Sequence, residues 1–240
     1  MIKNDNQSFY IAIVGQNLHI DYFESKDINS SYQKNYLMPD TLGDNLNLII
    51  LSKFILEKVK DFEKDAGSFI EKVYLITDAK YDQFSLSLKN KFNSNKIKEA
   101  DIVRLISDAK QQIIRNNKDC VILHLLVDKY IVDGEEYLQF PEDVRYNEFI
   151  VEISFITIQN STVKTLNKIF KDCNIEVKKI ISHQYSSRFA EKSDISPCTA
   201  AKRVIDGINP LEVISHRLYN KKQGFFEKMF NFLTKSCIVL

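Results

Sequence analysis

Apolar residues along this chain follow two different spacings, and each spacing predicts a different kind of element. The longest apolar run, residues 120–127, is rich in β-branched and leucine side chains and predicts a buried strand. In residues 149–158 the alternation predicts a second strand with only one fully buried face. Its inward positions are Phe149, Val151, Ile153 and Phe155, and its other face carries Ile150, Glu152, Ser154 and Ile156. Between the two strands, a short apolar run at 130–132 precedes Asp133-Gly134, a pair that supplies the positive φ of a turn.

The same two spacings predict elements on both sides of this central stretch. A polar connection is expected over 24–42, and a change of character follows residue 190, where loops alternate with short segments that could be helical. Because strands and helices alternate closely over residues 71–182, that span is expected to fold as one compact unit. The predicted hairpin strands are 9–15 and 18–23, the other strands lie near 73–76, 84–88 and 177–181, and the helices cover 44–67, 102–113, 161–173, 198–204, 211–220 and a last stretch from about 224.

One stretch resembles a known family. The residues Leu123-His124, Tyr130 and Val132-Asp133-Gly134 stand at the spacing of the inserted subdomain of FtsA, a bacterial actin-like membrane tether of cell division. Val127 replaces the proline of the family pattern. A strand, a helix and the segment 175–181 follow in the family's order, so the resemblance covers about residues 71–190.

The resemblance implies an α+β fold in three parts. Residues 1–70 and 183–204 would form a remnant of the first actin-like (ribonuclease H-like) subdomain. Residues 71–182 would form the FtsA-type inserted subdomain, with strand-helix-strand-strand order. Residues 205–240 would supply a linker and a C-terminal amphipathic helix.

The family's nucleotide chemistry is not expected here. Actin-like ATPases carry an Asp-x-Gly-Thr/Ser motif in the first hairpin, and the matching residues are Ile13-Val14-Gly15-Gln16. Ile13 offers no carboxylate for hydrated magnesium. None of the six glycines forms a Walker loop or a G-x-G-x-x-G motif, and the second half of an actin fold does not follow. We therefore expect no enzyme activity, no ATP and no other cofactor.

Other candidate chemistry is weak. His124 and His183 have no nucleophile or carboxylate at a telling spacing, so a packed strand residue and a polar loop residue are expected. The four cysteines lack CxxC spacing, so reduced thiols are expected, with neither a disulfide framework nor a metal site. They are Cys120, Cys173, Cys198 and Cys237. The acidic pairs 135–136 and 142–143 predict a solvated rim.

Composition limits the partners. The chain has 44% hydrophobic and 27% charged residues, as soluble globular proteins do. Its 33 basic and 32 acidic residues balance, so no nucleic acid partner is expected. No run of about 18 apolar residues and no apolar signal core occurs, which predicts the cytoplasm, and the resemblance implies that of a bacterium.

The C-terminal segment predicts an in-plane membrane helix. Large apolar side chains fall within an arc of roughly 160°, and lysines lie upstream and on the remaining face. The apolar set is Phe225, Phe226, Met229, Phe230, Phe232 and Leu233, and the basic set is Lys221, Lys222, Lys228 and Lys235. This stripe could instead pack on the protein's own core or on a partner helix. The last four residues, beginning at Cys237, also fit a prenylation pattern.

These observations favour a non-catalytic scaffold of the cell-division machinery, peripheral on the inner face of the cell membrane. The resemblance implies self-association or binding of division proteins through residues 71–182, while the family's contact with FtsZ lies in the other half of the fold. Three alternatives stay open. They are a PilM-like pilus or secretion scaffold without the terminal membrane helix, a lipid-anchored host-directed protein, and a phosphate-binding enzyme.

Overall fold

The computed structural model describes residues 7–24, 27, 29–39, 48–96, 98–141, 144–192, 194 and 196–213. The chain folds as two units. Unit 1 consists of residues Met1–Tyr81 and Ile158–Ile208, and unit 2 consists of Asp82–Thr157 and Asn209–Leu240. Among the described residues, no helix combines the length and the apolar character needed to cross a membrane.

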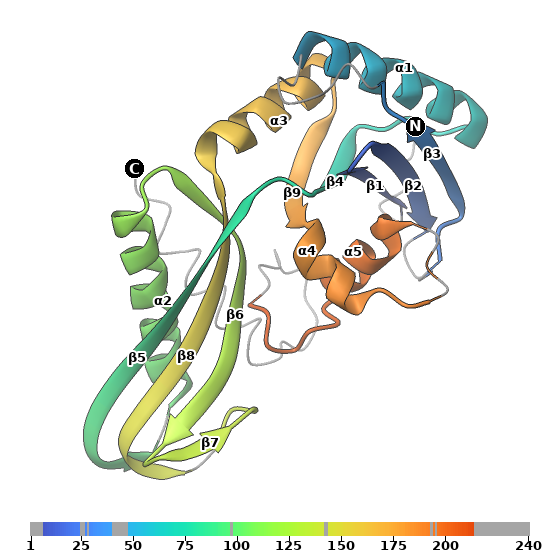
Figure 1. The fold of residues 1–240 in the computed structure, drawn as a ribbon. Helices are drawn as coiled ribbons and strands as arrows, with labels where there is room; N and C mark the ends of the chain where they lie inside the picture. The colour runs from blue at the N-terminus through green and yellow to red at the C-terminus, as the bar shows by residue number, and fades with distance from the viewer. Residues whose placement is uncertain are drawn as a thin grey trace. The chain divides into compact units, whose positions relative to one another are not determined.

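Unit 1 is built on a five-stranded sheet with the order β3-β2-β1-β4-β9 (Figure 1). β2 runs antiparallel to both β1 and β3, while β4 runs parallel to both β1 and β9. This order and these directions are those of the ribonuclease H-like sheet in actin-like subdomains, as expected. The strands are β1 (Gln7–Val14), β2 (Asn17–Glu24), β3 (Tyr32–Leu37), β4 (Lys72–Thr77) and β9 (Glu176–Ser182).

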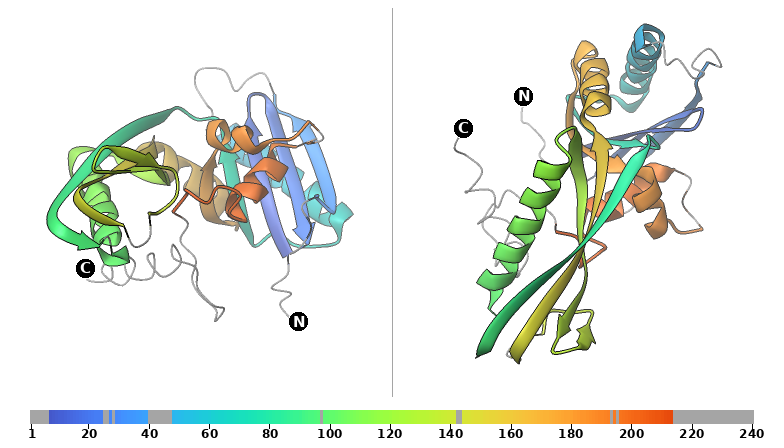
Figure 2. Two further views of the ribbon diagram at one scale, coloured as in Figure 1. Left: turned by 90° about the horizontal axis from the view of Figure 1, so that it is seen from below. Right: turned by 60° about the vertical axis from the view of Figure 1, so that its left-hand side comes forward.

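Helices cover both faces of this sheet (Figures 1 and 2). On one face, α1 (Leu48–Ala66) packs against β2 and β3, and α3 (Asn160–Asp172) packs against β9 and α1. On the other face, α5 (Pro197–Ile205) packs against β1, β2 and β4, next to α4 (His183–Ser186) and a 3-10 turn. Apolar side chains of the sheet are therefore buried on both sides.

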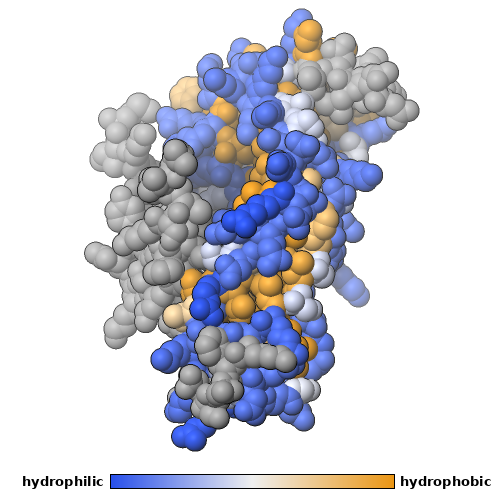
Figure 3. Space-filling view, turned by 90° about the vertical axis from the view of Figure 1, so that its left-hand side faces the viewer, coloured by the Kyte–Doolittle hydropathy of each residue, from blue (hydrophilic) through white to orange (hydrophobic). Residues whose placement is uncertain are grey.

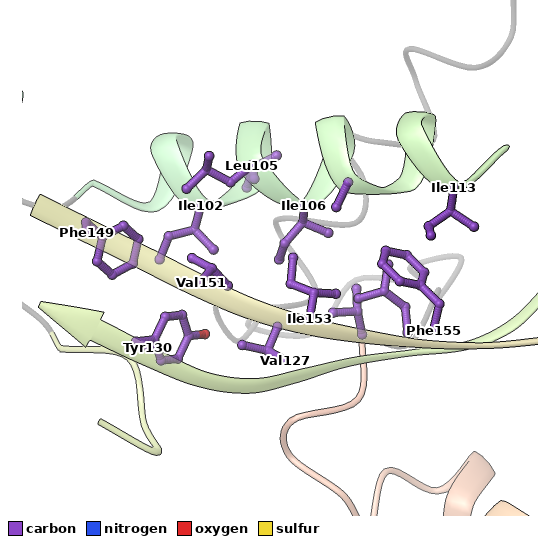
Figure 4. Close-up of a cluster of buried hydrophobic side chains, with 14 of the residues drawn as sticks. Ile102, Leu105, Ile106, Ile113, Val127, Tyr130, Phe149, Val151, Ile153 and Phe155 are labelled. Carbon is purple, nitrogen blue, oxygen red and sulfur yellow. The ribbon is translucent and has the colours of Figure 1, made fainter. Parts of the chain in front are cut away.

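Unit 2 is a four-stranded sheet with the order β5-β8-β6-β7, and one helix covers one of its faces. Helix α2 buries an apolar stripe against the strands, and Figure 4 shows this core. The elements are β5 (Tyr81–Lys96), α2 (Glu99–Asn116), β6 (Cys120–Val132), β7 (Glu135–Tyr137) and β8 (Arg145–Gln159). Apart from the short β7, this is the predicted strand-helix-strand-strand order.

The unit boundary differs from the predicted span 71–182. Strands β4 and β9 and helix α3 belong to unit 1, because both strands join the sheet through parallel pairing with β1 and with each other. Local alternation cannot reveal a partner that lies about 60 residues earlier in the chain. The inserted unit is consequently narrower than predicted.

Four local expectations also differ from the structure. β3 occupies part of the predicted polar connection, and β6 is one strand rather than two short runs. The second half of β8 is buried on both faces, since Ser154 and Ile156 are buried as well as Ile153 and Phe155. Of the helix predicted over 211–220, the described part, 211–213, forms a turn and a β-bridge instead.

Candidate functional site

The first candidate site is the hairpin turn of unit 1, where an actin-like ATPase would hold phosphate. Ile13 pairs with Leu18 near the end of β1, and Gly15 follows with a φ of 55°. The amide N–H of Gly15 donates a hydrogen bond to Oδ2 of Asp78, at 2.6 Å. Asp78 comes directly after β4, and parallel pairing brings the ends of β1 and β4 to the same edge of the sheet. A phosphate brought to this amide would therefore meet a carboxylate.

Other polar groups line the same edge. Ser182 caps α4, since its hydroxyl accepts a hydrogen bond from the N–H of Tyr185 at 3.2 Å. His183 is the first residue of α4 rather than a loop residue as expected. Burial lowers the pKa of His19, and the neighbouring His183 lowers it further. Within the described parts of the chain, no group of three or more His, Cys, Asp or Glu side chains is placed to hold a metal ion.

In the Asp133-Gly134 turn of unit 2, the aspartate side chain has a structural role. Both residues have positive φ, 49° and 93°. The Asp133 carboxylate accepts hydrogen bonds from the backbone N–H groups of Asn147, at 3.0 Å, and Glu148, at 2.7 Å. The N–H of Asp133 in turn donates to the carbonyl of Glu148 at 2.9 Å. The turn thereby fixes the end of β6 to the start of β8.

Residues 211–213, which follow unit 1 in the sequence, pair with β6. The N–H of Val127 donates to the carbonyl of Leu211, and the N–H of Val213 donates to the carbonyl of Leu125, both at 2.9 Å. Glu212 lies between them, opposite Leu126 in an antiparallel bridge. Through these bonds unit 2 holds residues 211–213 along β6.

A buried hydrogen-bonding contact between a histidine and a glutamate reinforces this segment. Nδ1 of His124 lies 2.8 Å from Oε1 of Glu212, and their side chains are 0% and 2% exposed. His124 is buried in its strand as expected, and the structure adds a carboxylate partner that the spacing of residues in the sequence did not indicate. The partner is 88 residues away in the sequence, so no local spacing could indicate it.

The α2 face of unit 2 leaves apolar surface uncovered along the edge strand β5. Phe84, Leu86 and Leu88 are only half-buried where they pack against the core. Figure 3 shows apolar side chains reaching the surface on the side where α2 and β5 lie, bordered by hydrophilic ones. Apolar surface of this kind, rimmed by polar residues, is typical of protein contact sites.

The opposite face of the same sheet carries a polar network. The hydroxyl of Ser154 on β8 donates to the carboxylate of Asp128 on β6 and lies 3.1 Å from the hydroxyl of Ser85 on β5. Ser154 is buried, and this network satisfies its hydroxyl. The two faces of unit 2 therefore differ in chemistry as well as in covering.

The remaining sequence candidates are placed as follows. Cys173 and Cys198 are buried, and Cys120 is half-buried. Glu135 and Glu136 are exposed, and Glu136 pairs with Lys129 at 2.5 Å. The residues Glu142 and Asp143, the membrane candidates over 221–235 and Cys237 lie outside the described residues.

Residues 83–157 match the family model of the SHS2 domain inserted in FtsA. The match covers almost all of the first segment of unit 2 and none of unit 1. It includes Leu123, His124 and the Asp133-Gly134 turn, on which the resemblance was based. An FtsA-type SHS2 unit is thereby supported for the inserted part of the chain.

Comparisons with whole proteins are less specific. No protein of curated function matches the sequence. Among solved structures, the PilM-PilN type IV pilus biogenesis complex has a TM-score of 0.49 at 8% identity, over 75% of this chain and 48% of that one. The cytoplasmic domain of EpsL, an inner membrane component of the type II secretion system of Vibrio cholerae, has a TM-score of 0.34 at 9% identity, over 78% of this chain and 59% of that one.

A protein of unknown function with an actin-like ATPase fold, from Bacteroides thetaiotaomicron, has a TM-score of 0.31 at 11% identity. This match covers 79% of the present chain and 60% of that one. The chain thus spans about half to three fifths of the length of these solved structures.

Proposed function

We propose that this protein is a non-catalytic scaffold of the cell-division machinery that binds other proteins through unit 2 and attaches to the inner face of the cell membrane. The observation that carries the proposal is the match of residues 83–157 to the SHS2 domain of FtsA. The half-buried stripe of Phe84, Leu86 and Leu88 supports a protein contact on this unit, because apolar side chains left at a surface gain most when a partner covers them.

The stripe allows a sharp test. Leu86→Glu with Leu88→Glu places two charges on the apolar face of β5. The matched control, Gln83→Glu with Ser87→Glu, places the same charges at exposed positions of the same strand that point the other way. A fluorescent fusion of the full chain should mark the division septum, lose that position in the leucine variant and keep it in the control.

The outcomes of this test separate the candidate functions. A fusion that stays diffuse in dividing cells would contradict a role in division. Foci on the envelope away from the septum would favour the alternative, a scaffold of pilus or secretion machinery, which would share the order of strands and helix in unit 2. Thermal melting followed by circular dichroism should show that both variants remain folded.

The proposed scaffold neither binds nor hydrolyses ATP. Two observations support this part: Ile13 stands where the family has its magnesium-orienting aspartate, and the Gly15 amide donates to Asp78. Titration calorimetry with magnesium-ATP should detect no heat of binding. Saturable binding at micromolar nucleotide would overturn this part of the proposal and favour the phosphate-binding enzyme instead.

Membrane attachment is proposed from the sequence of the tail. Phe226 and Phe230 belong to the apolar arc, so Phe226→Glu with Phe230→Glu should abolish flotation with anionic vesicles. Asn231→Glu with Thr234→Glu is the matched control, because both residues lie outside that arc. If the phenylalanine variant floats as well as the unmodified chain, the tail is not the anchor. If only protein exposed to a prenyltransferase floats, the lipid-anchored alternative through Cys237 holds.

A further inference from the structure

The charges on α1 are divided between two sides of the helix. At about 100° per residue, the acidic residues Glu57, Asp61 and Asp65 follow one flank, which also carries Lys58, and three further lysines follow the adjoining flank. The remaining acidic residue, Glu63, lies on the far side of those lysines, where its Oε1 accepts from the N–H of Ile70 at 2.7 Å. These three lysines are Lys53, Lys60 and Lys64, all exposed. The lysines of this flank therefore form a basic strip along α1.

The acidic side is already neutralised within unit 1. Lys58 lies 2.6 Å from Glu57 and 3.5 Å from Asp61, and Lys34 of β3 pairs with Asp65. The lysines on the other side form no ion pair with any residue that the structure describes. Their positive charge is therefore available to a partner.

Helix α3 repeats the basic pattern. Its lysines stand four and three residues apart, at Lys164, Lys168 and Lys171, and all three are exposed. They lie opposite the buried residues of the helix, Leu166, Ile169 and Phe170. No acidic residue occurs in α3 before Asp172 at its last position. Up to Asp172, the charged residues on its outward face are therefore all basic.

The two basic faces adjoin. The helices pack on the same face of the sheet, and Sγ of Cys173, directly after α3, donates to the carbonyl of Ser52 on α1 at 3.7 Å (Figure 1). The pKa of the Cys173 thiol is raised by burial and by Asp172, and the charge of Lys60 opposes this rise. Lys60 therefore lies near the end of α3 that contacts Ser52. Together the two helices present six exposed lysines, none of which forms an ion pair with a residue that the structure describes, and we call this surface of unit 1 the lysine layer.

The chemistry of the lysine layer fits an anionic lipid surface. It contains no arginine, the residue that best recognises individual phosphates and bases through its planar fork. Ile49 shares the lysine side of α1 and is 68% exposed, and an apolar side chain beside lysines can enter a headgroup region. Such contacts need many separate cations rather than a shaped pocket.

We propose that the lysine layer of α1 and α3 is a second membrane contact, which binds anionic phospholipid independently of the C-terminal tail. It deepens the proposed membrane attachment and rests on it for its location in the cell. A layer on the folded unit holds that unit against the bilayer, whereas a tail alone would leave it tethered by a linker.

The test uses the full chain and vesicles of phosphatidylcholine with about 30% phosphatidylglycerol, at about 0.1 M salt. The variant is Lys60→Gln, Lys164→Gln and Lys168→Gln. The control, Lys80→Gln, Lys118→Gln and Lys192→Gln, removes three exposed lysines from outside the layer and so has the same net charge. The layer variant should bind at least about tenfold more weakly, with a shallower salt dependence, and the control within about twofold of the original.

The tail variant Phe226→Glu with Phe230→Glu separates this proposal from the tail anchor. Residual salt-dependent binding that disappears when the layer variant is added supports the lysine layer. If the tail variant abolishes binding while the layer variant has no effect, the lysine layer is not a lipid contact although the tail anchor holds. Equal losses in the layer variant and the lysine control would reduce the effect to net charge and overturn the proposal. The same variants are also tested for binding to duplex DNA. A layer variant that loses binding to DNA but keeps binding to vesicles would overturn the proposal as well, because the lysines would then contact nucleic acid rather than lipid.

Discussion

The two sheets of this protein are covered differently. The sheet of unit 1 lies between α1 with α3 on one face and α4 with α5 on the other. Consecutive residues of a strand, which point to opposite faces, are therefore both buried, as Tyr10 and Ile11 are. The sheet of unit 2 has one helix on one face, and its edge strand β5 keeps apolar residues half-exposed. This difference indicates which kind of partner each unit can bind. The exposed helices of unit 1 carry charged side chains, and the exposed part of β5 in unit 2 carries apolar ones.

The units also bury polar groups differently. In unit 1, Asp21 is 0% exposed, and Ser196 donates to its carboxylate at 3.1 Å. Ser196 is also the N-cap of α5, where it accepts from the N–H of Cys198. In unit 2, the buried carboxylate of Glu212 has a histidine partner. Burial raises the pKa of Asp21, so this group should make the stability of unit 1 depend on pH, while the buried pair of unit 2 should be sensitive to removal of either partner.

The largest expected effect is on the core of unit 2. Phe155 is 0% exposed, and Phe155→Ala should lower the free energy of unfolding by about 3 to 5 kcal/mol through lost burial and a cavity. The control is Phe69→Ala in unit 1, where the ring is 76% exposed, and it should cost less than about 0.5 kcal/mol. Urea unfolding of the full chain measures both. Similar losses would mean that the ring of Phe155 is not part of the core.

The second effect concerns the pH dependence of unit 1. Burial raises the pKa of Asp21 from 3.8 to about 7, against the hydrogen bonds from Ser196 and Cys198. The folded state therefore keeps a proton that the unfolded chain loses, so this group makes stability fall as pH rises from about 4 to about 7. The full difference is at most about 4 kcal/mol. Asp21→Asn should flatten this decline, because the amide oxygen can still accept from Ser196.

Urea unfolding at several pH values decides this point. The original chain should be less stable at about pH 8 than at about pH 5, and the asparagine variant should gain relative to it at the higher pH. An unchanged slope in Asp21→Asn would show that another group causes the pH dependence.

A third, smaller effect is expected at the buried pair of unit 2. Glu212→Ala removes the bond to His124 while the imidazole stays buried, and should cost about 1 to 3 kcal/mol. The double-mutant cycle with His124→Ala isolates the contact from the loss of either side chain alone. A coupling energy below about 0.3 kcal/mol would mean that the pair contributes nothing of its own.

The sequence predicts the individual strands and helices well, but it poorly predicts which strands pair and which distant residues meet. The positions Phe149, Val151, Ile153 and Phe155 are buried as their alternation predicts, because side-chain period is a local property. The parallel pairing of β4 with β9 could not be seen, because the two strands are separated by the whole inserted unit. For the same reason the sequence did not indicate that Asp78 meets Gly15 or that Glu212 meets His124. Candidate sites made of distant residues need the fold.

The smallest expected effect compares the turns of the two units. Gly15 has a φ of 55° and Gly134 a φ of 93°, and a Cβ at either would meet nothing within 4 Å. Any loss therefore comes from the backbone rather than from a clash. A φ near 55° is the left-handed region that L residues tolerate, so Gly15→Ala should cost about 1 kcal/mol. The φ of Gly134 lies outside that region, and Gly134→Ala should cost about 2 kcal/mol.

Asparagine tolerates left-handed backbone, so Gly15→Asn should recover most of the loss at the first turn, whereas Gly134→Asn should recover little at the second. Urea unfolding measures the four variants, and equal recovery at both turns would show that their backbones are strained alike.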